Sequence, residues 1–129
     1  MSRRPALLAA LAALLTAAIL APAGSAKPAP APTRLLVRGY EYNLLLSQLK
    51  LNPGNAIVQF ANQGEDAHDL QIQRVGDDEV FSVPEQPAGE VGEAGLHLQR
   101  DSRYVLWCSL PNHRELGMEA SLRVRRKRR

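Results

Sequence analysis

The chain has 129 residues, of which 45% are hydrophobic, 5% aromatic and 22% charged, and its formal net charge at neutral pH is +3. This charge is unevenly distributed: residues 27–124 hold 9 basic and 13 acidic residues, a net charge of −4, whereas residues 125–129 form the basic run RRKRR. A chain of this length holds one small domain. Its few aromatic residues and mildly acidic body argue against a nucleic-acid-binding protein.

The N-terminal residues predict export. Arg3 and Arg4 precede an apolar run without charges that extends from Ala6 to about Leu20, and the small residues of APAGSAK follow it. This is the pattern of a secretory signal peptide, residues 1–26, and it predicts a periplasmic or otherwise extracytoplasmic protein. The alternative is a retained membrane anchor. The run falls short of the roughly 20 apolar residues that a membrane-spanning helix needs, so we expect no stable membrane insertion.

The rest of the chain predicts a single all-β domain. Proline alternates with alanine in KPAPAPT (27–33), which indicates an extended linker. Short strand-like runs follow at 34–40, 42–47, 56–62, 68–74, 79–83, 96–99, 104–109 and 120–124, with turn signals between them, including PAGEVGEAG (87–95). Several runs alternate apolar and polar residues, and none keeps a helical period. We therefore expect an antiparallel β-sandwich over residues 34–124, followed by a basic tail at 125–129.

The segment CSLPNHRELGM (108–118) contains three residue types that bind metals. Cys108 is the only cysteine, Met118 is the only methionine besides Met1, and His113 is one of three histidines. In an exported protein a single cysteine cannot form an internal disulfide. Its thiol is therefore buried, linked to another molecule, reactive, or bound to a metal.

Strand geometry predicts that these residues meet at one end of the sandwich. Tyr104, Leu106 and Cys108 share one face of their strand, so Cys108 ends that strand pointing into the core. Residues 109–117 form a loop, and Met118 begins the returning strand. Because partners across an antiparallel pair lie about 5 Å apart, the cysteine and the methionine can meet.

Two histidines complete the predicted site. His113 lies in the middle of the loop and can fold back over the gap, and His68 opens a strand directly after the turn in GEDAHDL. Two imidazoles, a thiolate and a distant thioether are the donor set of a type 1, or blue, copper centre. The sequence therefore predicts one copper ion bound by His68, Cys108, His113 and Met118. Such a mixed set of donors suits both oxidation states, as an electron carrier requires.

Two segments of the chain resemble the cupredoxin family, the group of plastocyanin and azurin. They are NQGEDAHDLQI (62–72) and YVLWCSLPNHRELGMEASLRV (104–124), and the resemblance extends over residues 34–124. It implies a Greek-key sandwich with copper held under the loops at one end. It also implies that the family's ligands fall on His68, Cys108, His113 and Met118, and that His113 lies nearest the surface, where electrons enter and leave.

One residue departs from the family pattern. The family usually carries asparagine after its first histidine ligand, where the side chain helps to connect the two ligand segments. This chain has Asp69 at that position. An ionised carboxylate accepts hydrogen bonds but cannot donate one, so the connection and the electrostatics near the metal should differ.

The surroundings of the predicted site suggest how partners dock. Leu110, Pro111 and Leu116 surround His113 and can form a small apolar surface, through which a monomer would bind redox partner proteins transiently. We interpret Glu65, Asp66 and Asp69, which flank His68, as a solvated loop, with an acidic docking patch as the alternative. The remaining residues have structural roles: His97 faces solvent from its strand, and Tyr104 and Trp107 pack against the sheets.

We considered three functions for these residues. The first is an extracytoplasmic electron carrier, and the alternative is a copper-binding protein that carries or buffers the metal without redox turnover. An enzyme is disfavoured, because a copper oxidase or reductase needs further histidines and only His97 remains. A zinc site would rarely use methionine. We therefore expect a non-enzymatic electron carrier.

Overall fold

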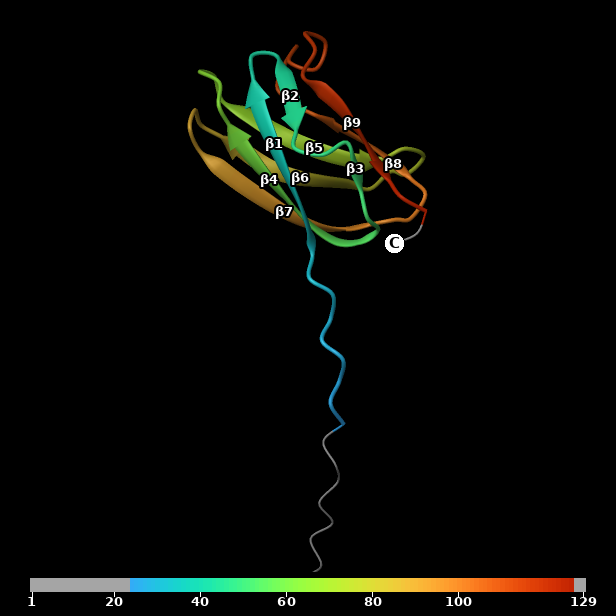
Figure 1. The fold of residues 1–129 in the computed structure, drawn as a ribbon. Helices are drawn as coiled ribbons and strands as arrows, with labels where there is room; N and C mark the ends of the chain where they lie inside the picture. The colour runs from blue at the N-terminus through green and yellow to red at the C-terminus, as the bar shows by residue number, and fades with distance from the viewer. Residues whose placement is uncertain (1–23, 127–129) are drawn as a thin grey trace, which may run out of the picture.

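A computed structural model describes residues 24–126 and consists of two β-sheets packed face to face (Figure 1). The strands are β1 (Thr33–Tyr40), β2 (Asn43–Leu46), β3 (Lys50–Leu51), β4 (Gly54–Asn62), β5 (His68–Arg74), β6 (Val80–Gln86), β7 (Val91–Leu98), β8 (Arg103–Trp107) and β9 (Glu119–Val124). The predicted all-β sandwich is confirmed. Across residues 24–126, no helix has the length and apolar character needed to span a bilayer.

The two sheets are mixed rather than purely antiparallel. One sheet has the strand order β2-β1-β4-β7, and the other has the order β3-β9-β8-β5-β6. In the first, β1 runs parallel to β4, and in the second, β3 runs parallel to β9. The prediction of antiparallel pairing was therefore wrong for these two pairs. The alternation of side chains along a strand is the same in both kinds of pairing, so the sequence pattern could not distinguish them.

Strand β7 begins within the segment that was predicted as a turn. Residues 87–95 are rich in glycine, yet the strand starts at Val91 and includes Gly92. A Cβ on Gly92 would lie only 2.6 Å from the Val83 side chain of β6. Glycine is present here because two segments approach closely, and not because the chain turns. The sequence also gave no signal for β3, which is two residues long.

The core lies between the sheets and is built from every second residue of the main strands. Tyr104, Leu106 and Cys108 are buried on one face of β8 and its extension, whereas Val105 and Trp107 on the other face are half-buried. The predicted orientation of this strand is therefore confirmed. The other fully buried large side chains include Leu35, Val37, Leu51, Phe60, Leu70, Ile72, Leu98 and Leu122. Because β8 is fixed by this packing, its last inward position carries the cysteine into the core.

Three connections gather at one end of the sandwich (Figure 1). They are the two-residue turn between β1 and β2, the segment 63–67 between β4 and β5, and the loop 108–118 between β8 and β9. The proline-containing segment 27–32 extends from the opposite end. The predicted signal peptide (1–26) and basic tail (125–129) fall mostly on residues 1–23 and 127–129, outside the described residues.

Candidate metal centre

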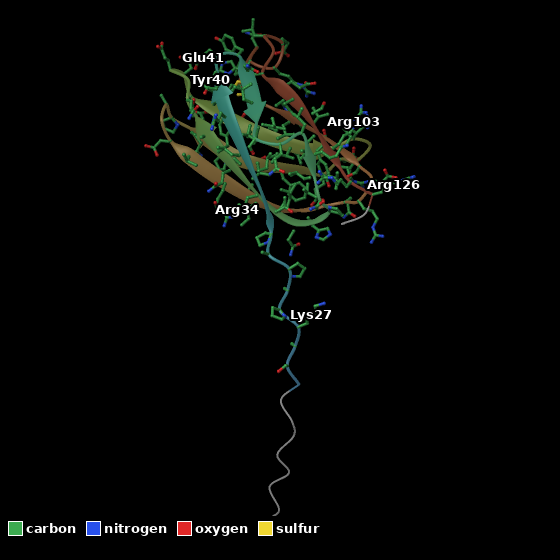
Figure 2. The ribbon with its side chains drawn as sticks, in the orientation of Figure 1. Lys27, Arg34, Tyr40, Glu41, Arg103 and Arg126 are labelled. Carbon is green, nitrogen blue, oxygen red and sulfur yellow. The ribbon has the colours of Figure 1, made fainter. Side chains whose placement is uncertain are left out.

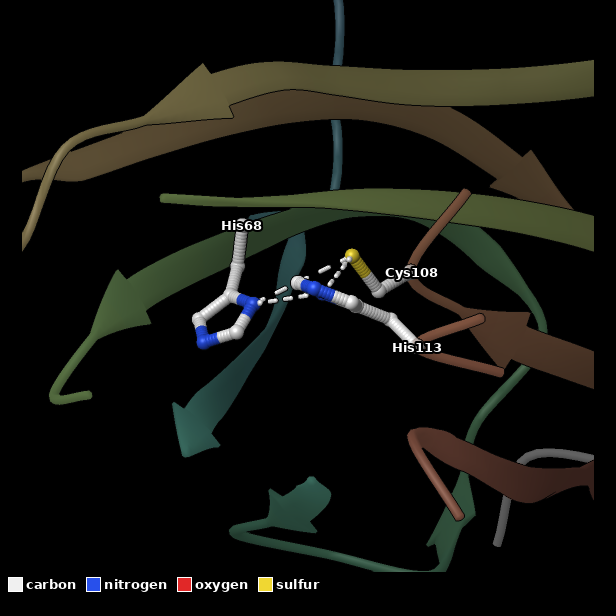
Figure 3. Close-up of side chains that lie close together, drawn as sticks. All are labelled: His68, Cys108 and His113. Carbon is white, nitrogen blue, oxygen red and sulfur yellow. Dashed lines mark hydrogen bonds between the residues drawn. The ribbon is translucent and has the colours of Figure 1, made fainter. Parts of the chain in front are cut away.

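The three connections bring the predicted imidazole and thiol donors together. His68 is the first residue of β5, Cys108 directly follows β8, and His113 lies in the loop 108–118. Figure 3 shows the His113 ring, the Cys108 sulfur and one nitrogen of His68 facing one another. Their donor atoms all lie within 4.8 Å of one another.

The spacing of the three donors fits a single metal ion. The Nδ1 atoms of His68 and His113 are 3.1 Å apart, and the Cys108 Sγ lies 3.5 Å from the second of these and 4.0 Å from the first. Nitrogen and sulfur ligands held about 2.0–2.3 Å from one ion lie roughly 3.3–3.8 Å from each other. The two imidazoles and the thiol therefore need little movement to share an ion, and together they are the equatorial donor set of a type 1 copper site.

The donors differ in their exposure to solvent. His68 and Cys108 are fully buried, whereas His113 is half-buried. The expectation that His113 lies nearest the surface therefore agrees with the structure. His113 is therefore the only one of these three donors that solvent reaches.

Met118 lies at the same end, as the last residue of the loop 108–118, directly before β9. Its carbonyl accepts a hydrogen bond from the Cys108 amide at 3.1 Å, and its amide donates to the His113 carbonyl at 3.0 Å. The side chain is fully buried, and its terminal methyl lies beside Gly39, where a Cβ would approach it to 3.2 Å. The predicted proximity of Cys108 and Met118 is therefore confirmed for their backbones, which share a hydrogen bond. Ligation of the metal by the Met118 thioether stays a prediction.

The structure assigns a partner to His68 that the sequence did not reveal. Its Nε2 lies 2.7 Å from the Oε1 atom of Glu41, the first residue of the β1–β2 turn. The same oxygen accepts hydrogen bonds from the amides of Glu65 and Asp66 at 2.9 and 2.8 Å. The amide of Asp66 above all, with that of Glu65 and the imidazole, lowers the pKa of Glu41 to about 2. Glu41 is therefore ionised at neutral pH and can only accept.

The next residue of this turn contacts the other imidazole. The Tyr42 ring meets the His113 ring edge to face, with centroids 4.9 Å apart and an angle of 65° between the planes. The two-residue turn thus contacts both imidazoles of the candidate site. In the sequence, Glu41 was only the residue between two predicted strands, and Tyr42 was the first residue of the second one (42–47).

The expectation that Asp69 belongs to a solvated loop was wrong, because its side chain is buried and hydrogen-bonded. Asp69 connects the two ligand segments although it is not an asparagine. Its Oδ1 accepts the Ser109 amide hydrogen at 2.6 Å, and its Oδ2 accepts from the Ser109 hydroxyl and, at 2.8 Å, from Gln71 Nε2. All three partners donate, so a carboxylate suffices. Burial would raise the pKa of Asp69, but the hydrogen bonds from Ser109 and Gln71 outweigh it and leave the pKa below its usual value.

The surroundings of the Cys108 thiol determine its protonation state. Burial raises its pKa, and the nearby charge of Asp69 acts in the same direction, while the backbone amides of Leu110 and Asp69 oppose them. The free thiol is therefore protonated at neutral pH. A metal ion that binds it must displace that proton.

The other residues considered from the sequence lie around or away from this group. His97 is exposed and bonds to Asn55, as expected for a solvent-facing strand residue. Tyr104 is buried, and the guanidinium of Arg114 lies 4.5 Å above the Trp107 ring and pairs with Glu119. The predicted contact surface is partly apolar: Leu110 is half-buried, Pro111 is exposed, and Leu116 is 58% exposed.

Several solved structures share the fold of this chain. Reduced auracyanin from Roseiflexus castenholzii is 18% identical, with a TM-score of 0.60, over 74% of this chain and 98% of its own. Auracyanin A, described as a "blue" copper protein from Chloroflexus aurantiacus, is 16% identical, with a TM-score of 0.59, over 73% and 99%. Reduced rusticyanin is 15% identical, with a TM-score of 0.59, over 76% and 82%. The chain has the cupredoxin fold.

These similarities concern the fold, because the identities of the sequences are only 15–18%. No protein-family model matches the chain, and no curated protein matches it either. The cupredoxin resemblance that two segments indicated is nevertheless confirmed for the fold across the strands of the domain.

Proposed function

We propose that this protein binds one copper ion at His68, Cys108, His113 and Met118 as a type 1 centre and carries single electrons as a monomer between partner proteins. The observation that supports the proposal is the convergence of two imidazole nitrogens and the only thiol within 4.8 Å at one end of the fold. Bound copper would supply the redox chemistry by alternating between Cu(I) and Cu(II). The protein supplies donors that suit both states.

The fixed positions of these donors favour electron transfer over metal delivery. His68 and Cys108 are fully buried, and Asp69 connects the segments that carry them. A site that hands its metal to another protein should be open and mobile, so that ligands can be exchanged. This site is closed on the side of the core, and its ligand segments are joined by hydrogen bonds, which reduces rearrangement when the charge of the ion changes.

His113 and its neighbours are the proposed contact with redox partners. The imidazole is half-buried, and the exposed Leu116 and Pro111 belong to the same loop. A small apolar surface favours brief encounters, because weak redox complexes bury little area. This role requires no substrate pocket and no second metal centre, so we propose a carrier and not an enzyme. The predicted signal peptide supports a function outside the cytoplasm as part of this proposal.

Optical spectroscopy of the purified domain tests the proposal. Addition of copper(II) should give an intense visible absorption from charge transfer out of the Cys108 thiolate, and Cys108→Ser should abolish it without unfolding the protein. Zinc(II), which has no such transition, is the matched control for metal binding. Voltammetry should then show a reversible one-electron couple. A protein that binds copper(II) but stays nearly colourless would refute the type 1 centre and support copper storage or transport.

A further inference from the structure

The orientation of the His68 ring is defined, because each of its two nitrogens lies within hydrogen-bond distance of a polar side chain. Nδ1 lies 3.1 Å from Nδ1 of His113, inside the candidate site (Figure 3). Nε2, the other ring nitrogen, lies 2.7 Å from Oε1 of the Glu41 carboxylate. The same oxygen already accepts two backbone N–H groups, so it faces the imidazole as a hydrogen-bond acceptor. The proton of the neutral ring must therefore be on Nε2, which leaves the lone pair of Nδ1 directed at the metal position.

The acceptor oxygen is itself held in place. Oε1 of Glu41 accepts hydrogen bonds from the backbone N–H groups of Glu65 and Asp66, which precede His68 by three and two residues respectively. The neighbouring Gly64 leaves room for the carboxylate, since a Cβ there would lie 2.7 Å from Cδ of Glu41. The β1–β2 turn and the segment before β5 are thus joined at a single oxygen atom, which also contacts the imidazole.

Burial makes this contact different from an ordinary surface ion pair. The His68 side chain is fully buried, while the Glu41 side chain is 26% exposed (its position at the loop end of the sandwich is labelled in Figure 2). A carboxylate behind a histidine ligand fixes the tautomer of the ring and makes it a stronger donor. Its negative charge also favours the more positive ion, which is Cu(II).

We propose that Glu41 is a positioning residue that orients His68 for metal binding and lowers the reduction potential of the centre, a role that rests on the proposed copper function. It acts through the imidazole and does not touch the metal. Two properties follow. Removal of the charge alone should change the potential, and removal of the hydrogen-bond acceptor should also change the ring tautomer and the affinity for copper(II).

Two substitutions separate these properties. Glu41→Gln keeps an oxygen at the Oε1 position but has no charge, so it should raise the reduction potential while His68 keeps its tautomer. Glu41→Ala removes the acceptor as well, and it should weaken copper(II) binding by about ten- to a hundredfold. The matched control is Glu115→Gln in the loop that carries His113. Within residues 24–126, no hydrogen bond joins the exposed Glu115 carboxylate to either imidazole of the site. This control should leave copper affinity unchanged and shift the potential by less than Glu41→Gln does.

A measurement on the metal-free protein tests the orientation directly. Two-bond ¹H–¹⁵N correlation spectra at about pH 8, where an ordinary imidazole is neutral, report which nitrogen of His68 carries the proton. We expect Nε2–H in the wild type and in Glu41→Gln, and a mixture of tautomers in Glu41→Ala. Nδ1–H in the wild-type protein would overturn the proposal without any variant, even if an alanine variant failed to fold.

The outcomes for copper and for Glu41 can be distinguished. A wild-type protein with Nε2–H on His68 but no affinity for copper(II) would refute the copper function and retain the orienting contact. A copper-binding protein in which Glu41→Gln and Glu115→Gln have the same potential would refute the role of Glu41 in setting that potential. Voltammetry and copper titration of the three variants are therefore run with the spectra.

Discussion

The connection between Asp69 and Ser109 should make a measurable contribution to stability. The carboxylate accepts two hydrogen bonds from Ser109 and one from Gln71. A hydrogen bond to a charged group contributes about 1.5–3 kcal/mol, but Ser109 is exposed, so its freed donors would bond to water. We therefore take about 1 kcal/mol for each of the three bonds, which is below this range, and expect Asp69→Ala to cost about 3 kcal/mol. Asp69→Asn keeps one acceptor oxygen, so we expect about half this loss.

The effect of Asp69 should depend on pH in a defined direction. Its pKa is lower in the folded protein than the ordinary value of 3.8, because the Ser109 and Gln71 hydrogen bonds outweigh the effect of burial. A carboxyl with a lowered pKa stabilises the fold above its unfolded value, and this stabilisation is lost as pH falls through the folded value. The difference between wild type and Asp69→Asn should therefore be largest near neutral pH and should shrink below about pH 4.

Urea unfolding of the metal-free protein measures both effects, with the fluorescence of Trp107, the only tryptophan, as the signal. Asp78→Ala is the control, because Asp78 is exposed and its substitution should change the free energy of unfolding by less than about 0.5 kcal/mol. An Asp69→Ala protein as stable as this control would refute a stabilising connection. A loss in Asp69→Asn that stays constant from pH 7 to about pH 3 would refute the contribution of the charge.

Three further predictions concern the metal donors. Met118→Leu should raise the reduction potential, because it removes a thioether that stabilises Cu(II) more than Cu(I). Met118→Gln supplies an oxygen donor instead and should lower the potential. Equal potentials of the wild type and both variants, measured by voltammetry, would exclude Met118 as a ligand. His113→Gly should leave a site that recovers its visible absorption on addition of imidazole, because His113 is the half-buried donor; a site insensitive to imidazole would contradict this. Because burial raises the pKa of Cys108, copper(II) binding at neutral pH should release its proton, and apparent affinity should rise with pH. Calorimetry in buffers of different ionisation enthalpy measures that release, and its absence would contradict a thiolate ligand.

The donor residues could be predicted from the sequence because they are rare. One cysteine and one internal methionine leave little choice of sulfur ligands, and the alternation along residues 104–108 determines which face Cys108 occupies. Packing of Tyr104 and Leu106 in the core then fixes that face in the structure. The same alternation predicted a sandwich. It could not predict parallel pairing, which depends on how the chain passes from one sheet to the other.

The hydrogen-bond partners of the donors could not be found in the same way. Glu41 is one of 13 acidic residues and lies 27 positions before His68 in the chain. Its contact arises because β1 pairs in parallel with β4, which brings the β1–β2 turn beside the segment 63–67. The sequence pattern does not determine that pairing. Nothing in the sequence therefore distinguishes Glu41 from any other glutamate in a turn. The residues around Asp69 indicated only a solvated loop, and it was the cupredoxin resemblance, which predicts asparagine there, that pointed to a role beside the metal.

These two carboxylates explain how the site can depart from the family pattern and still keep its connections. All the groups around Asp69 are donors, so the amide of an asparagine is not needed, and Glu41 supplies an acceptor for His68. The pKa values of both carboxyls are lowered, so both are ionised at neutral pH. Each places a negative charge beside a donor segment, and both charges favour the oxidised ion. We therefore expect the reduction potential of this centre to be lower than that of a comparable site with the same four predicted donors. In that comparable site, asparagine occupies position 69 and a neutral group accepts the hydrogen bond from His68. A protein that accepts the electron from this centre can then be a correspondingly weaker oxidant.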